Sequence, residues 1–214
     1  MKYIKEYIPI DGVKRQNVKI TPTSITIHST NNATSTAKNE RDNLAREDNL
    51  RRASFHIAVD ENEAIECIPL NEKALHSGTS VGNNSSISIE MCESGNRSKV
   101  INNTVKLVAQ MLHERNWGVN KLKRHYDWSG KNCPSIMSAN NWNKWSVFLN
   151  DVNKELIRLN KPKVHWGEEY YNNLVKKGVV LTDKRFDDKI TRAEAMALVD
   201  KTADAIIKMI NGVK

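Results

Sequence analysis

The 214-residue chain has no run of about 18 apolar residues, the length that a membrane-spanning helix needs. Its beginning, MKYIKEYIPI, contains lysine but no extended apolar stretch and no small-residue cleavage site, so we expect no secretory signal. Internal repeats and low-complexity tracts are also missing. These absences argue against a membrane protein and predict that synthesis ends in the cytoplasm.

Cysteine is scarce, with only Cys67, Cys92 and Cys133 in the whole chain. An odd number of cysteines, together with the expected lack of an export signal, argues against a framework of disulfide bonds. We therefore expect free thiols, or one thiol that serves as a metal ligand. Cys67 fits the core, and Cys92 fits either a buried position or the wall of a cleft.

Acidic residues are outnumbered, because 33 lysines and arginines face 25 aspartates and glutamates and give a formal net charge of +8. Such a charge favours a polyanionic partner, whether nucleic acid, an anionic wall polymer or a membrane surface. No basic stripe with interleaved aromatic residues stands out, which argues against nucleic acid. The hydrophobic content of 39% is enough to build a core.

Two segments show the two-residue period of strands that are apolar on one side. In SITIH, Ile25 and Ile27 alternate with polar residues, which places His28 at a strand end on the polar face. In NNSSISIEMCES, Glu90 and Cys92 share the face opposite the apolar residues. We therefore expect Glu90 to point away from the apolar side of the sheet.

The segment ASFHIAVDENEAIECIPL predicts two strands joined by a hairpin turn at DENE. In the first strand, Phe55, Ile57 and Val59 are expected on one face, with His56 and Ala58 on the other. Two later segments, beginning at Ser98 and at residue 140, have the apolar spacing of amphipathic helices, and the first is expected to end at Gly118. The charged segment 34–52 is typical of an exposed helix or a partly ordered loop, and its charge run from Lys38 to Arg52 could rim a groove. The fold predicted for residues 1–158 is an α/β domain in which helices flank a mixed central β-sheet.

Residues 159–214 predict a second, smaller helical domain after the linker NKPKV. Its first helix is indicated by aromatic and apolar residues at every fourth position from Trp166, with a stop at Gly178. Its second helix is indicated by a capping box that joins Thr191 to Glu194. A unit of roughly 50 residues is marginal for independent folding.

A catalytic zinc site needs about three protein ligands and one open position, and imidazole and thiolate ligands suit zinc better than calcium or magnesium. His28, His125 and Cys133 would supply that set. Pro134 would fix the chain after the thiolate, and Lys131 could point into the same cleft. Each signal is weak alone, because a lone histidine at a strand end is usually structural.

In their order along the chain, the stretches ITIHST, ASFHIAVDE, IPLNEKALHSG, SISIE and RHYDWSGKNCP resemble zinc amidases of the N-acetylmuramoyl-L-alanine amidase type 2 family. That family includes phage endolysins and is related to the peptidoglycan recognition proteins. The resemblance covers about residues 20–140 and implies a groove for a muropeptide with zinc at its floor. It implies hydrolysis of the amide between N-acetylmuramic acid and the L-alanine of the stem peptide.

The resemblance assigns the zinc ligands to His28, His125 and Cys133, and the catalytic roles to Glu90 and Lys131. Glu90 would act as the base that activates water, and Lys131 would hold the oxyanion that forms on the carbonyl. Three further residues are expected as substrate contacts in the groove: Phe55, His56 and His76. Either histidine fits a purely structural role equally well. Several relatives carry tyrosine where this chain has Phe55, and a phenyl ring cannot donate a hydrogen bond.

The C-terminal stretches HWGEEYYNNLVKKG and ITRAEAMALV resemble a single S-layer-homology module. Such modules bind anionic wall polymers, and one copy alone would bind weakly, so avidity from a homo-oligomer or a dimerisation role is expected. A helical appendage packed on the first domain is the alternative. For the whole chain we expect an endolysin or autolysin that acts on peptidoglycan after release, with a non-catalytic peptidoglycan-binding protein as the competing hypothesis.

Overall fold

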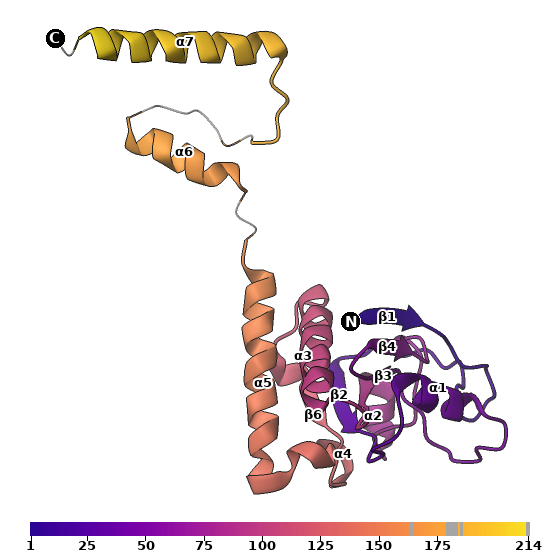
Figure 1. Ribbon diagram of the computed structural model, residues 1–214. Coiled ribbons are helices and arrows are strands. Elements are labelled where there is room, and N and C mark those ends of the chain that lie inside the picture. The colour runs from indigo at the N-terminus through magenta and orange to yellow at the C-terminus, as the bar shows by residue number, and fades with distance from the viewer. Residues whose placement is uncertain (163–164, 179–183, 185, 213–214) are drawn as a thin grey trace. The chain divides into compact units, whose positions relative to one another are not determined.

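The computed structural model describes residues 1–162, 165–178, 184 and 186–212 (Figure 1). The chain forms two compact units, Met1–Lys161 and Pro162–Lys214. The boundary expected at residue 158 falls inside the last helix of the first unit, α5 (Ala139–Asn160). Among the described residues, no helix is both long enough and apolar enough to cross a bilayer.

The first unit is built on one mixed six-stranded sheet with the order β1-β4-β3-β5-β2-β6. β3 and β4 form the antiparallel hairpin that the DENE segment predicts, and all other neighbours are parallel. The predicted fold class, a mixed sheet flanked by helices, is confirmed. The strands are β1 (Lys2–Lys5), β2 (Ser24–Ser29), β3 (Ile57–Val59), β4 (Glu63–Glu66), β5 (Ser86–Met91) and β6 (Leu122–Arg124).

Each face of the sheet carries its own hydrophobic cluster. The larger cluster lies under α3 (Arg97–Glu114) and α5, and it receives the alternate apolar residues of β2 and β5, such as Ile27 and Ile89. The smaller cluster lies under α1 (Ala37–Ala45) and includes Leu44. Figure 1 accordingly places α3 and α5 on one side of the sheet and α1 on the other. The predicted alternation in both strands is thus confirmed, and the polar residues of β2 and β5 belong to the α1 side.

The predicted strand around Phe55 is corrected by the structure. β3 begins only at Ile57, so Phe55 precedes the strand and does not follow its alternation. Its ring packs in the smaller cluster with Ala58, whereas Ile57 and Val59 lie in the larger one. Phe55 is therefore on the α1 side of the sheet.

The ends of α3 also differ from the prediction. Its cap is Asn96 rather than Ser98, because the Asn96 side chain accepts a hydrogen bond from the Lys99 backbone N–H at 3.1 Å. The helix ends at Glu114, well before Gly118. Asn116, with φ +53°, takes the left-handed conformation that stops a helix, a role that asparagine fills at modest cost.

The second unit contains α6 (Gly167–Lys176) and α7 (Arg192–Asn211). The predicted capping box is confirmed: Thr191 accepts a hydrogen bond from the backbone N–H of Glu194, and the Glu194 carboxylate accepts one from that of Thr191 at 2.8 Å. Of the predicted linker NKPKV, residues 163 and 164 lie outside the described residues.

An N-terminal segment is bound to the loop that follows β4 and leads to the candidate site. Backbone hydrogen bonds join residues 18–20 to residues 71–73. Within this contact the buried Glu72 carboxylate accepts hydrogen bonds from Arg15 at 2.8 Å and from Lys19 at 3.0 Å. The hydrogen bond from Arg15 contributes most to holding the pKa of Glu72 below its usual value. This charged contact therefore anchors the loop that leads to the candidate site.

Replacing Glu72 by glutamine should lower the free energy of unfolding by about 1–3 kcal/mol at neutral pH, because Arg15 loses its charged acceptor. The folded-state pKa of Glu72 is lowered, so its contribution is present above the ordinary carboxyl pKa and disappears as the pH falls through the lowered value. Urea denaturation should therefore show a difference between wild type and Glu72→Gln at pH 7 that narrows on acidification.

The matched control is Glu155→Gln, which removes an exposed ion pair with Arg158 on α5. This change should alter stability by less than about 1 kcal/mol. If the difference in unfolding free energy between wild type and Glu72→Gln stayed constant into the acid range, the effect could not be assigned to the carboxylate charge.

Candidate metal centre

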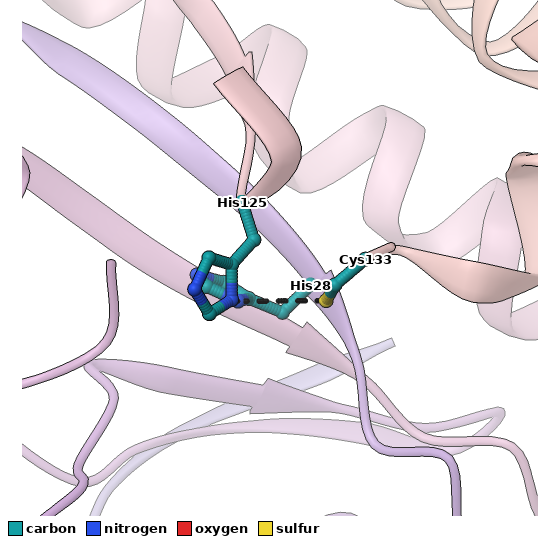
Figure 2. A group of neighbouring side chains, drawn as sticks. All are labelled: His28, His125 and Cys133. Carbon is teal, nitrogen blue, oxygen red and sulfur yellow. Dashed lines mark hydrogen bonds between the residues drawn. The ribbon is translucent and has the colours of Figure 1, made fainter. Parts of the chain in front are cut away.

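Three segments that are distant in sequence bring His28, His125 and Cys133 together (Figure 2). His28 lies near the end of β2, and His125 directly follows β6, which pairs with β2 in parallel. Cys133 returns to the same place because its carbonyl accepts a hydrogen bond from the Tyr126 N–H at 3.1 Å. One potential ligand atom from each residue lies within 4.8 Å of the other two.

The distances within this group fit a tetrahedral zinc ion. His28 Nδ1 lies 3.1 Å from His125 Nδ1 and 3.7 Å from Cys133 Sγ. Zinc–nitrogen and zinc–sulfur bonds of ordinary length separate neighbouring tetrahedral ligand atoms by about 3.3–3.6 Å. Two imidazoles and one thiol are also the donor types that zinc prefers. The group therefore passes a test of both geometry and chemistry.

Hydrogen bonds fix which nitrogen of His28 carries its proton. His76 Nε2 lies 3.1 Å from the Ser86 carbonyl, which can only accept, so this nitrogen donates. His76 Nδ1 is then an acceptor, and it receives the N–H of His28 Nε2 at 3.1 Å. The neutral ring of His28 consequently presents a lone pair on Nδ1 toward His125 and Cys133.

His125 is oriented in the same way by Ser77, the residue that follows His76. The Ser77 backbone accepts a hydrogen bond from the ring of His125. Since His125 Nδ1 faces His28, the nitrogen that donates to Ser77 is Nε2, and the lone pair is again on Nδ1. Two lone pairs thus face each other, an arrangement that a bound cation stabilises. The Asn83 side chain secures both supports by accepting from the backbone N–H groups of His76 and Ser77, each at 2.9 Å.

Burial sets the protonation of the three candidate ligands. It lowers the pKa of His28 well below the usual value and that of His125 to about 4, so both rings are neutral at pH 7. Burial, with the Glu90 charge as the next cause, raises the pKa of the Cys133 thiol to about 11. Neutral imidazoles are ready to bind a metal, whereas the thiol must lose its proton as the metal binds.

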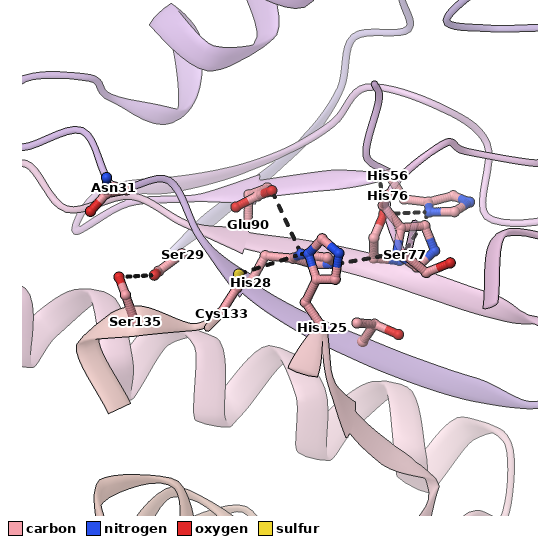
Figure 3. A network of polar contacts seen from close by, with 12 residues as sticks. His28, Ser29, Asn31, His56, His76, Ser77, Glu90, His125, Cys133 and Ser135 are labelled. Atoms are coloured by element: carbon pink, nitrogen blue, oxygen red, sulfur yellow. Dashed lines mark hydrogen bonds and ion pairs between the residues drawn. The ribbon is translucent and has the colours of Figure 1, made fainter. Parts of the chain in front are cut away.

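Glu90 lies beside this group because β2 and β5 are parallel and in register, with His28 opposite Glu90. Its Oε1 is 4.0 Å from His28 Nδ1. Its Oε2 is buried and has no hydrogen-bond partner among the described residues. Burial is the main cause that raises the pKa of this carboxyl to about 8. The side chain is therefore a free proton acceptor or donor next to the candidate metal position (Figure 3).

A cavity of about 840 Å³ opens over the centre. Besides the candidate ligands and Glu90, three of the residues expected at the site line it: Lys131, Phe55 and His76. His56 does not line the cavity. It is fully buried, with Nδ1 3.0 Å from the Ser88 backbone N–H and Nε2 2.8 Å from the Glu72 carbonyl. The position of His56 indicates a structural role.

Sequence reasoning did not identify the supports Ser77, Asn83 and Ser86. Ser77 and Ser86 act through their main-chain carbonyls, which every residue type possesses. Their residue types therefore do not indicate this role in the sequence. Asn83 lies in a short polar helix, α2 (Ser80–Ser85), that resembles an ordinary loop in sequence. Of the remaining cysteines, Cys67 and Cys92 are buried in the smaller cluster, away from the centre.

The chain is similar to known proteins in both sequence and structure. Residues 18–136 match the family described as N-acetylmuramoyl-L-alanine amidase. The chain is 42% identical over 126 residues to the N-acetylmuramoyl-L-alanine amidase CwlA of Bacillus subtilis, covering 55% of this chain and 45% of CwlA. It is 36% identical over 166 residues to XlyB, an N-acetylmuramoyl-L-alanine amidase of the same species, covering 74% of this chain and 51% of XlyB.

Among solved structures, the catalytic domain of XlyA superposes with a TM-score of 0.65 at 30% identity, covering 71% of this chain and 99% of that domain. The chain spans about half the length of the curated relatives it matches. The family match, by contrast, takes in more than half of this chain and includes every residue of the candidate centre. The chain therefore belongs to the N-acetylmuramoyl-L-alanine amidase family.

Proposed function

We propose that this protein is a zinc-dependent hydrolase that cuts the amide bond between N-acetylmuramic acid and L-alanine in bacterial peptidoglycan. The observation that carries the proposal is the convergence of two imidazole lone pairs and one thiol beside the Glu90 carboxylate, whose buried Oε2 has no hydrogen-bond partner among the described residues. A non-catalytic binding protein would have no need of this costly arrangement. Family membership supplies the substrate class.

Zinc bound by His28, His125 and Cys133 would polarise the substrate carbonyl and lower the pKa of a water molecule. Glu90 is placed to take the proton of that water on its free oxygen and to return it to the leaving nitrogen. Its raised pKa favours such exchange near neutral pH. Lys131, exposed on the cavity wall, is suited to hold the negative charge that develops on the carbonyl oxygen.

For the second unit we propose a role in attachment to the cell wall or in association between copies, like that of an S-layer-homology module. The apolar side chains of α7, including Met196, Val199 and Ile210, are exposed. Exposed apolar surface of this kind is typical of an interaction site. We further propose that the protein acts on the wall after release from the cell.

Mass spectrometry of the fragments released from purified cell walls is the experiment that tests the proposed reaction. Cleavage should yield free N-terminal L-alanine and unmodified N-acetylmuramic acid, and chelator should abolish it. Fragments cut within the glycan strand or within the peptide would overturn the assignment of the bond. Binding to walls without any release of fragments would support the non-catalytic alternative.

Replacing Cys133 by serine should remove both zinc and activity, because a hydroxyl is a poor substitute for thiolate. Zinc affinity should fall by more than the roughly 10–100-fold that changes outside the ligand shell produce. Metal content and chelator competition provide the measurement. The control is Cys92→Ala, which removes a buried thiol outside the cavity and should retain zinc. Full zinc binding by Cys133→Ser would refute the ligand set.

Replacing Glu90 by glutamine should lower kcat about 10²–10⁴-fold while zinc remains bound, because only the proton acceptor is lost. Steady-state kinetics and metal analysis of the same preparation separate these effects. Glu93→Gln is the matched control, since Glu93 follows β5, accepts a hydrogen bond from Asn31 and does not line the cavity. Equal losses for the two variants would argue against a catalytic role for Glu90.

His76 should matter for metal affinity more than for catalysis, because it fixes the proton on His28. His76→Leu is expected to weaken zinc binding about 10–100-fold, and His76→Asn, which keeps an acceptor near Nδ1, should weaken it less. Chelator competition measures this directly. The control is His56→Leu, which removes another buried ring and should lower stability without changing zinc affinity. If His56→Leu lost as much zinc affinity as His76→Leu, the loss would reflect a general packing effect.

A further inference from the structure

The second unit has no hydrophobic core of its own. Among its described residues only Gly167 is buried, so none of their apolar side chains is removed from water. A unit of roughly 50 residues is marginal even with a core, and most of the stability of a helix in a protein comes from packing of its apolar face. The long helix α7 therefore requires another surface to pack against.

The apolar residues of α7 are spaced as in a coiled coil. Five of them follow one another at alternate intervals of three and four residues and form the α7 seam: Met196, Val199, Ala203, Ile206 and Ile210. This alternation is that of the a and d positions of a heptad repeat, which lie along one side of a helix. All five side chains are exposed, and the four larger ones are between 49% and 69% exposed. The seam is thus open along its whole length.

The surface of the seam suits close packing against another helix. A groove of about 720 Å³ lies along its N-terminal half and is lined by Met196, Val199 and Ala203. The small Ala203 leaves space into which a larger side chain of a facing helix can insert. Beside the seam, the Thr202 hydroxyl donates to the Leu198 carbonyl at 2.7 Å and therefore requires no partner outside the helix.

The charges of α7 argue against an anionic polymer or a membrane as the occupant of the seam. The helix has no net formal charge, because its three basic and three acidic residues balance: Arg192, Lys201 and Lys208, and Glu194, Asp200 and Asp204. A helix that binds an anionic lipid surface is instead rich in lysine and arginine on its polar face. A protein surface of the same apolar period is the better match.

Length distinguishes the protein surfaces that could cover the seam. From Met196 to Ile210 the seam is about 21 Å long, at about 1.5 Å per residue. The exposed apolar row of α6 in the same unit, Trp166, Tyr170 and Leu174, is only about 12 Å long by the same measure. It would leave a large part of the seam in water. The α7 of a second copy has the same length and the same spacing, so it can cover the whole seam.

We propose that α7 is a dimerisation helix, whose seam packs against the α7 seam of a second copy of this chain. The dimer deepens the role proposed for the second unit, because it names association between copies as that role and assigns it to five residues. Two first units joined in this way would act on the same stretch of wall. Release of one would leave the other attached, which lengthens the residence of the pair.

Analytical ultracentrifugation of the full chain over a range of concentrations tests the proposal. Wild type should sediment as a dimer that dissociates on dilution. The change Ile206→Glu places a charge at the seam but keeps a good helix former, and it should weaken association by about 30-fold or more. Circular dichroism of both proteins at the same concentrations shows whether α7 remains helical when the copies separate.

Leu198→Glu is the matched control, because Leu198 lies on the same helix and is 62% exposed but stands outside the seam. It should leave the dimer intact. A wild-type protein that stays monomeric at every concentration would overturn the proposal, and so would equal weakening by Leu198→Glu and Ile206→Glu. If Ile206→Glu aggregates, Ile206→Ala compared with Leu198→Ala decides by the same criterion.

Packing of the seam within one copy gives a different result. A monomeric wild type whose melting temperature falls on Ile206→Glu would overturn the dimer in favour of a contact inside the chain. Association is measured in solution without walls and without turnover, so failure of the proposed reaction would not affect this test. Cleavage of walls by a strictly monomeric protein would likewise refute the dimer and leave the reaction standing.

Discussion

The orientation of two imidazole rings is the constraint on which the candidate site depends. Each ring is held at Nε2 by the segment that contains His76 and Ser77, and each therefore directs the lone pair of Nδ1 to one point. Lone pairs 3.1 Å apart repel one another unless a cation lies between them. Asn83 and the buried Glu72 in turn hold this segment in place. The geometry of the metal centre therefore depends on residues that are not themselves ligands.

The parallel register of β2 and β5 is the second requirement, because it sets Glu90 beside His28. A carboxylate whose buried oxygen has no hydrogen-bond partner among the described residues costs folding free energy, as does a cluster of neutral histidines removed from water. The large apolar cluster under α3 and α5 lies on the opposite face and offsets that cost. The face that carries the site holds only the smaller cluster, so most of the apolar packing lies on the other face.

Local patterns predicted four of the six strands, β2 to β5, and the alternation of β2 and β5, because the side-chain period of a strand depends only on neighbouring residues. They placed His28 and Glu90 on the correct face, but not opposite each other, since register depends on which strands pair. Likewise, residue type alone did not choose His28 and His125 among six histidines; the order of motifs within a family resemblance did. His56 stands within such a motif yet is buried away from the cavity.

Features set by main-chain groups or by missing partners leave no trace in a single sequence. The Ser77 and Ser86 carbonyls orient the ligands, but any residue has a carbonyl at that position. Arg51 and Arg46 belong to one charged segment; Arg46 pairs with the nearby Asp48, whereas the fold places Arg51 over the cavity. A guanidinium that has lost no donor to the protein keeps its full capacity for a ligand. The place of this arginine over the cavity therefore depends on the fold and not on its residue type.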